Sequence, residues 1–401
     1  MTVPRPVYAP APTASHFAPG ELSILVFGPG RGEAMVVIHP DGHLGVVDGC
    51  REPARGAADG TGDPVREFIR VWHRAHPELN DRLRFVALTH PHDDHYAGLA
   101  RLMEGYSGRI DHLWSPFPTG DQYVQCFRDY YRFERPNADE VPDEDLLAGL
   151  TRYYTAFEQC RTGDQAPKYT CMLGDRRLYE RDMLGSQLKI HSVAPDDDDL
   201  LYAHANLTQA LQQATDEGVR KLQRVRHNPN LTSGALVIRW GSAQVLLGGD
   251  LLCAEGKFKG WGQAASFVEG PIQLVKAAHH GSAGARELDM LRRIQPTMVV
   301  LTPFQEAKNG QPPKPEDVRA LLEVCPEVAL SSPPHWWSAN GTRPQPRQRP
   351  RTTPARRAAR NSILQVTPDP PPTADGVGVS LDAAGNVTRV VLTGRADLYE
   401  L

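Results

Sequence analysis

The sequence predicts an α/β fold, because apolar runs of strand length alternate with segments whose apolar residues recur at helical spacing. Residues 22–47 are rich in strand-forming residues, and residues 63–72 have the features of an amphipathic helix. The chain has 401 residues, of which 40% are hydrophobic, and this is enough for a large core. A charged fraction of 23% is typical of a globular protein.

The N-terminal half is predicted to begin with a flexible segment rich in proline and alanine, residues 1–20. The helix that follows the first strands begins at Pro64, because Asp63 is a suitable N-cap and proline suits the first helical turn. The further elements predicted up to residue 199 are a strand over residues 85–89, a helix over 96–106, a strand from 112, an inserted helical pair within 116–188, a strand over 189–195 and a solvated acidic helix start at 196–199.

The predicted insertion at residues 116–188 interleaves tyrosine and phenylalanine with arginine. This combination can stack nucleic-acid bases and hold phosphates, but ordinary packing of an amphipathic helical hairpin also explains it. The elements predicted for the C-terminal half are strands over residues 243–250, 274–278 and 296–302, a helix over 315–324, a disordered arginine- and proline-rich segment at 343–360 and a hairpin over 376–392.

Charge and cysteine content exclude several classes of protein. The net charge of −4 argues against a surface that coats nucleic acid uniformly, although a local basic patch remains compatible with it. The six cysteines include no Cys-x-x-Cys pair, which favours reduced thiols in a cytoplasmic protein over a zinc finger or a disulfide scaffold. Residues 1–19 lack the features of a signal peptide, and no run of roughly 18 to 20 apolar residues predicts a membrane span.

The most informative motif is His-Pro-His-Asp-Asp-His at residues 90–95, which follows an apolar strand. His90 and His92 point the same way, because alternate residues of an extended chain share a face. The turn that follows brings Asp94 and His95 to a neighbouring point. The motif therefore predicts a metal site in which one short loop supplies ligands to two ions.

The His-x-His-x-Asp-His pattern resembles the metallo-β-lactamase superfamily of hydrolases. Further along the chain, an apolar strand ends in Gly-Gly-Asp at Asp250, which resembles the residue that bridges the two metals in this family. Residues 274–282 resemble its last ligand station and contain both His279 and His280. We expect His280 to be the ligand, because a glycine follows it, and His279 to lie beside the metals or contact substrate. Upstream, Asp48 ends a strand and is expected to support the histidine loop.

One expected ligand is ambiguous. The family's third motif is a histidine roughly twenty residues before the bridging aspartate, and His227 lies at about that distance. Residues 228–238, however, also resemble the hydrolase domain of ComEC-type competence proteins, which often lacks this histidine. That subfamily has a Gly-Gln-Gly-Asp turn near its start, whereas this chain has Gly-Arg-Gly-Glu ending at Glu33, which leaves the role of Glu33 open.

The resemblance implies an αββα sandwich that spans residues 21–401 as one catalytic domain. It also implies a pair of divalent metal ions, Zn²⁺ or Mn²⁺. Within such a site His90 and His92 would bind the first ion, Asp94, His95 and His280 the second, and Asp250 would bridge them. Asp94 would also orient the attacking water.

The resemblance favours a metal-dependent phosphodiesterase or nuclease that acts on nucleic acid or a nucleotide. Asn228, Asn230, Lys276 and Ser282 are the expected substrate contacts, and the arginine-rich segment could attract phosphates. Hydrolysis of a small-molecule amide, lactone or thioester is the alternative, since the same metals serve both reactions. A third alternative is a regulatory module that binds metal without turnover. The sequence does not indicate an oligomeric state.

Overall fold

The computed structural model describes residues 3–28, 32–50, 63–116, 144–162, 165–212, 228–304, 311–334, 336 and 375–400. His227 and the arginine- and proline-rich segment predicted at 343–360 lie outside these residues, as does most of the first half of the predicted insertion. In the part of the chain that is described, no helix is long and apolar enough to cross a membrane.

The described residues form two large sheets. The first has the order β1 (Val7–Ala9), β16 (Val387–Thr393), β15 (Gly376–Leu381), β2 (Leu22–Phe27), β3 (Ala34–Ile38), β4 (Leu44–Val47), β5 (Leu83–Ala87), β6 (Ile110–Ser115) and β7 (Lys168–Cys171). The second has the order β17 (Asp397–Glu400), β14 (Glu327–Leu330), β13 (Met298–Leu301), β12 (Leu274–Lys276), β11 (Ala243–Leu247), β10 (Ala235–Trp240), β9 (Ser186–Ala194) and β8 (Arg176–Met183).

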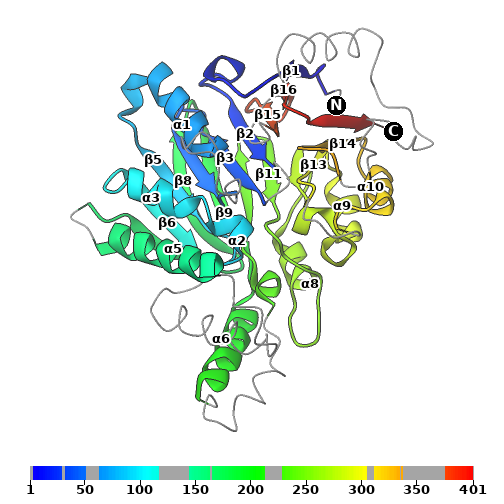
Figure 1. The fold of residues 1–401 in the computed structure, drawn as a ribbon. Coiled ribbons are helices and arrows are strands. Elements are labelled where there is room, and N and C mark those ends of the chain that lie inside the picture. Colours follow the sequence, from blue (N-terminus) through cyan, green and yellow to red (C-terminus); the bar gives the residue numbers. More distant parts are fainter. Residues whose placement is uncertain are drawn as a thin grey trace.

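The two sheets pack face to face, because each presents alternate apolar residues to the other. In β2, Ile24 and Val26 belong to the core between the sheets, whereas Leu25 and Phe27 belong to the core under the helices. Helices α1 (Pro64–Ala75), α3 (Leu99–Gly105) and α5 (Glu144–Thr162) lie on the side of the first sheet, and α9 (Leu288–Ile294) and α10 (Pro315–Leu322) lie on the side of the second (Figure 1). The predicted αββα sandwich is confirmed.

The strand directions bring several loops to one place. Strands β4 and β5 are parallel neighbours in the first sheet, and β11 and β12 are parallel neighbours in the second. Parallel neighbours end at the same edge of a sheet, so the loops that follow them lie close together. Within the described residues these loops carry Asp48, the His90–His95 motif, Asp250 and His280.

Two local predictions are confirmed in detail. The Asp63 carboxylate accepts hydrogen bonds from the backbone N–H groups of Val65 and Arg66, as expected of the N-cap of α1. The C-terminal hairpin is present as β15 and β16, which join the first sheet.

Other predictions of the elements are wrong. The N-terminal segment is not entirely flexible, because β1 pairs in parallel with β16 and Phe17 is buried. The predicted helix over residues 96–106 is present as α3 but begins only at Leu99, and a separate short helix, α2 (Asp93–Tyr96), precedes it. The predicted helical insertion continues into β7 and β8, which sit at the edges of the two sheets. The acidic start of α6 (Asp197–Gln212) is not fully solvated, because buried Asp199 accepts backbone hydrogen bonds from Lys259 and Gly260.

Candidate metal centre

The first candidate ligands lie on the loop and the short helix that follow β5. The ring nitrogens His90 Nε2 and His92 Nδ1 lie 2.9 Å apart. Asp94 and His95 lie in α2, which begins directly after His92. His90 and His95 are fully buried, so their rings face the protein interior. The short loop therefore directs its four predicted ligands toward one region, as their spacing suggested.

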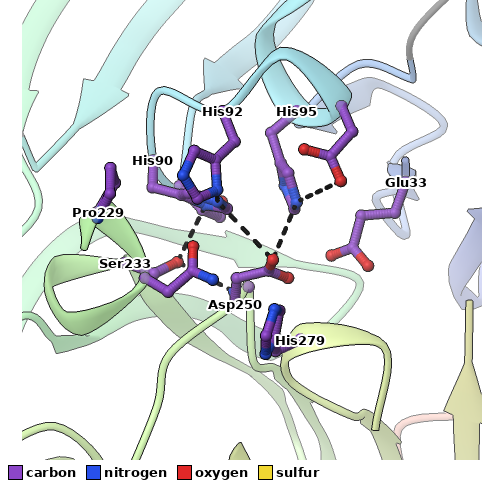
Figure 2. Close-up of polar contacts among 12 residues, drawn as sticks. Glu33, His90, His92, His95, Pro229, Ser233, Asp250 and His279 are labelled. Atoms are coloured by element: carbon purple, nitrogen blue, oxygen red, sulfur yellow. Dashed lines mark hydrogen bonds and ion pairs between the residues drawn. The ribbon is translucent and has the colours of Figure 1, made fainter. Parts of the chain in front are cut away.

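Asp250 lies at the centre of the cluster, on the loop that follows β11. Its Oδ2 atom is 3.7 Å from His90 Nε2, 3.5 Å from His95 Nε2 and 4.0 Å from His280 Nε2. Figure 2 shows the rings of His90, His92 and His95 above this carboxylate. Asp250 thus faces histidines from both predicted metal positions.

His280 reaches the cluster through an unusual turn after β12. His279, His280 and Gly281 all have positive φ, at 46°, 56° and 82°. A non-glycine residue with positive φ costs roughly 1 to 3 kcal/mol, so the surrounding structure must stabilise this turn. The turn places His280 Nε2 3.5 Å from Asp94 Oδ2. His279 Nδ1 lies 2.9 Å from Ser282 Oγ, and Figure 2 shows His279 beside Asp250.

The side chains have the composition of a divalent-metal site. His90, His92 and Asp250 form one group, and Asp94, His95 and His280 form another; within each group the ligand atoms lie within 4.8 Å of one another. His95 Nε2 and Asp250 Oδ1 are buried and have no hydrogen-bond partner among the described residues. Buried polar atoms without partners are costly, and metal coordination would satisfy both. Imidazole nitrogen and carboxylate oxygen suit Zn²⁺ and Mn²⁺.

Asp48 supports the histidine loop as predicted from its position at the end of β4. Its carboxylate accepts hydrogen bonds from the backbone N–H and the hydroxyl of Thr89, both at 2.8 Å. Oδ2 also lies 2.8 Å from His95 Nδ1. A proton on Nδ1 of His95 is stabilised by this carboxylate, and Nε2 is then free to bind metal. Asp48 itself has a φ of 60°, which aspartate tolerates better than most residues.

Other contacts orient His280 and His90 in the same way. The backbone carbonyl of Thr302, which follows β13, lies 2.8 Å from His280 Nδ1 and accepts its proton in a hydrogen bond. Thr89 Oγ1 and Ser233 Oγ lie 3.1 and 3.3 Å from His90 Nδ1. Ser233 Oγ also accepts the backbone N–H of Asp250 at 3.0 Å. One serine from the second sheet therefore contacts a candidate ligand from each sheet.

Burial and the local charges act in opposite directions on the pKa values of the cluster. Burial lowers the pKa of His90 well below its ordinary value. Burial also lowers the pKa of His95, but three nearby carboxylates outweigh it and hold this pKa well above its ordinary value. Burial raises the pKa of Asp250, but the positive charges of neighbouring histidines outweigh it and hold this pKa well below its ordinary value. The ionised carboxylates make the cluster attractive to cations.

The four predicted substrate contacts differ in their burial and in the residues that they contact. Lys276 is fully buried and its ammonium group contacts Glu33, so the prediction that Lys276 contacts substrate is wrong. Alternate residues of a strand share a face, so Lys276 lies on the same face of β12 as Leu274, which belongs to the core between the sheets. Asn230 is buried in the turn at Pro229–Thr232, and Asn228 caps that turn by accepting the Asn230 N–H. Ser282 contacts His279.

Sequence reasoning missed several residues that contact the candidate ligands. Thr89, Ser233 and Thr302 orient histidines, and Glu33 lies within reach of Asp250 and His280. Glu33 ends the Gly-Arg-Gly-Glu run directly before β3, and this position at the start of a strand is the signal that the sequence offers for it. The contacts of Ser233 and Thr302 depend on loops of the second sheet, and no local pattern marks them.

No protein-family model and no curated protein matches the chain. Among solved structures, the chain is similar to a mutant of CmlA β-hydroxylase, at 14% identity over 72% of this chain and 47% of that one, with a TM-score of 0.34. It is similar to the metallo-β-lactamase fold protein YhfI from Bacillus subtilis, at 12% identity over 77% of this chain and 96% of that one, with a TM-score of 0.36. It is also similar to a long form of RNase Z from yeast, at 10% identity over 80% of this chain and 42% of that one, with a TM-score of 0.39.

The chain spans about half the length of the CmlA protein and less than half of the yeast RNase Z. The fold is established by the molecule's own layers: two sheets face each other, and helices cover both outer sides. This arrangement is an αββα sandwich.

Proposed function

We propose that this protein is a metal-dependent hydrolase that activates a water molecule and cleaves a phosphodiester of nucleic acid or a nucleotide. The observation that carries the proposal is the position of Asp250. Its Oδ2 lies 3.7 Å from His90 Nε2 and 3.5 Å from His95 Nε2, so one carboxylate oxygen faces a histidine of each ligand group. A carboxylate so placed suits a bridging ligand of two neighbouring ions.

The chain supplies two sets of ligands for Zn²⁺ or Mn²⁺. We assign His90 and His92 to the first ion, Asp94, His95 and His280 to the second, and Asp250 to both, in agreement with the two groups of ligand atoms. At such a site divalent ions make hydroxide available near neutral pH and polarise the bond under attack. His227 lies outside the described residues, so the ligand set of the first ion is proposed without it.

The residues of the chain then have separate roles. Asp48 and the Thr302 carbonyl hold the rings of His95 and His280 in one orientation by accepting a hydrogen bond from Nδ1. Asp94 keeps slight contact with solvent, at 8% exposure, whereas Asp48 is fully buried. We therefore assign to the Asp94 carboxylate the orientation of the attacking water.

The substrate class rests on the sequence. Residues 228–238 and 276–282 resemble the ComEC-type hydrolase domain, and the arginines within 343–360 would attract phosphates. The carboxylates of the cluster would repel a negatively charged phosphate. Bound cations are therefore needed for a phosphodiester to approach the site.

The experiment begins with the number of Zn²⁺ and Mn²⁺ ions bound per purified chain. The loaded protein is then incubated with single-stranded and duplex DNA, RNA, bis-p-nitrophenyl phosphate and a chromogenic β-lactam. We expect phosphodiester cleavage that a chelator abolishes. The variants Asp250→Asn and His90→Ala should lose at least a hundred-fold in rate, because each loses a ligand.

Matched variants separate this loss from damage to the fold. Asp375→Asn replaces an equally buried carboxylate that binds Arg395 instead of the cluster, and His191→Ala removes a histidine from β9. Both should keep the wild-type rate. Cleavage of the β-lactam with every phosphodiester intact would favour a small-molecule hydrolase, and metal binding without any turnover would favour a regulatory module. Full activity of Asp250→Asn would refute the two-metal proposal.

A further inference from the structure

Glu33 is a buried carboxylate beside the candidate ligands, to which the metal site described above assigns no role. It lies directly before β3, and β3 is antiparallel to β4 with Met35 opposite Val47. The start of β3 therefore lies beside the end of β4, where Asp48 begins the loop. The side chain of Glu33 is fully buried. Figure 2 shows its carboxylate beside the cluster, on the side of Asp250.

The two oxygens of this carboxylate have different surroundings. Oε2 accepts a hydrogen bond from the Thr302 hydroxyl at 2.7 Å and contacts the ammonium group of Lys276. Oε1 is buried and has no hydrogen-bond partner among the described residues. Glu33, Asp250 and His280 each offer a ligand atom, and the three atoms lie within 4.8 Å of one another. The unpartnered oxygen thus belongs to a side chain that already reaches the cluster.

An ion pair with Lys276 alone does not account for this arrangement. Lys276 and Thr302 both contact Oε2, so a purely structural pair would leave a charged oxygen buried without a partner. Burial of such an atom is expensive unless a hydrogen bond or a cation compensates it. Asp48, Asp94, Asp250 and Glu33 are all buried, and Lys276 is the one buried lysine or arginine in contact with this group within the described residues.

We propose that Glu33 is a further metal ligand of this site, which binds the ion held by Asp94, His95 and His280 through Oε1. The inference rests on the proposed metal-dependent function. Lys276 is then a positioning residue: it holds Oε2 and so directs Oε1 to the cluster. A third carboxylate beside Asp94 and Asp250 makes the ligand set of this ion richer in oxygen, which favours Mn²⁺ over softer metals.

The test measures metal binding in four full-length proteins, three variants and the wild type. Glu33→Gln removes the charge and keeps the size of the side chain. This variant leaves the charge of Lys276 buried without its partner. A double variant, Glu33→Gln with Lys276→Met, is therefore included, because it removes both charges and leaves a neutral pair. Asp375→Asn is the control, since Asp375 is an equally buried carboxylate bonded to a cation, Arg395, outside the ligand groups. Wild type completes the comparison.

The affinities for Mn²⁺ and Zn²⁺ are measured by competition with a chelating dye, and the bound ions are counted after dialysis. We expect both Glu33 variants to bind one of the two ions at least ten-fold more weakly, because loss of even an outer partner of a metal ligand costs ten- to hundred-fold. Asp375→Asn should bind both ions like wild type.

The outcomes separate this inference from the proposed function. If the double variant folds and binds both ions with wild-type affinity, Glu33 is only the partner of Lys276 and the inference is overturned. The same conclusion follows if Glu33→Gln lowers the melting temperature of the metal-free protein without weakening the binding of either ion. If wild type binds no divalent ion, the proposed function itself fails and this inference fails with it.

Discussion

The support that Asp48 gives to the histidine loop can be tested by one substitution, Asp48→Asn. Asparagine keeps the size of the side chain and tolerates the φ of 60° at this position, so the backbone should be retained. The amide oxygen can still accept the Thr89 N–H in place of Oδ1. The amide NH₂ group, however, replaces Oδ2, which receives both the Thr89 hydroxyl and His95 Nδ1 at 2.8 Å.

The size of the effect follows from these two contacts. Hydrogen bonds to a charged group contribute about 1.5 to 3 kcal/mol each, so loss of two bonds should lower the free energy of unfolding by about 3 kcal/mol or more. Asparagine is neutral, so the substitution also removes the cost of burying the charged carboxylate, and this offsets part of the loss. Burial raises the pKa of Asp48, which reflects that cost. We therefore expect a net loss of about 3 kcal/mol, at the low end of the range. Metal affinity should fall ten- to hundred-fold, because His95 loses its orienting partner.

The free energy of unfolding is measured by urea denaturation of metal-free protein, and metal affinity by competition with a chelating dye. Asp375→Asn is a suitable control, because it also removes a buried carboxylate that accepts several hydrogen bonds, but from Arg395. The control should lose stability without losing metal affinity. Asp48→Asn with a stability within about 1 kcal/mol of wild type and an unchanged metal affinity would show that Asp48 does not hold His95.

Two further predictions concern residues outside the ligand set. Burial lowers the pKa of His39 from its ordinary 6.5 to about 3. As the pH falls, His39 therefore becomes protonated in the unfolded chain before it does in the folded protein. Stability should therefore decrease by about 2 kcal/mol between pH 7.5 and pH 5, and His39→Leu should lack this part of the decrease in urea denaturation at both pH values. Gly249 has a φ of 53°, and a Cβ there would lie 2.4 Å from the Gly234 carbonyl oxygen. Gly249→Ala should therefore lower the free energy of unfolding by at least about 2 kcal/mol. Gly185 also has positive φ, but a Cβ there would meet open space among the described residues, so Gly185→Ala should lower it by about 1 kcal/mol. Equal losses in the two variants would contradict the role of the contact between Gly249 and Gly234.

The sequence predicts those parts of the site that depend on local order along the chain. His90, His92, Asp94 and His95 are close in sequence, and the strand and turn that carry them determine their directions. His280 follows a strand in the same way. Glu33 and Lys276 could not be paired from the sequence, because their contact depends on how the first sheet lies against the second. Hydrophobic pattern defines which face of each strand is buried, but it does not define this alignment.

The same reasoning explains the errors in the fold. In β8, most of the residues between Arg176 and Met183 are charged and exposed, so its pattern of alternation is weak. The strand forms nevertheless, because its backbone pairs with β9 along seven positions and it lies at the edge of its sheet, where one side is solvated. Strand β1 is only three residues long and pairs with a strand nearly four hundred residues later in the sequence. Neither pairing has a local signal.

The candidate metal centre is built from loops at one edge of both sheets, and this position links metal binding to the stability of the whole sandwich. The histidine loop and Asp48 come from the first sheet, whereas Asp250 and His280 come from the second. The backbone N–H of Gly234 donates to the Thr89 carbonyl at 2.8 Å, so the loops of the two sheets already touch. The buried carboxylates nevertheless repel one another across this contact when no cation is present. A bound ion removes the repulsion and holds side chains of both sheets, so its binding energy stabilises the folded state directly.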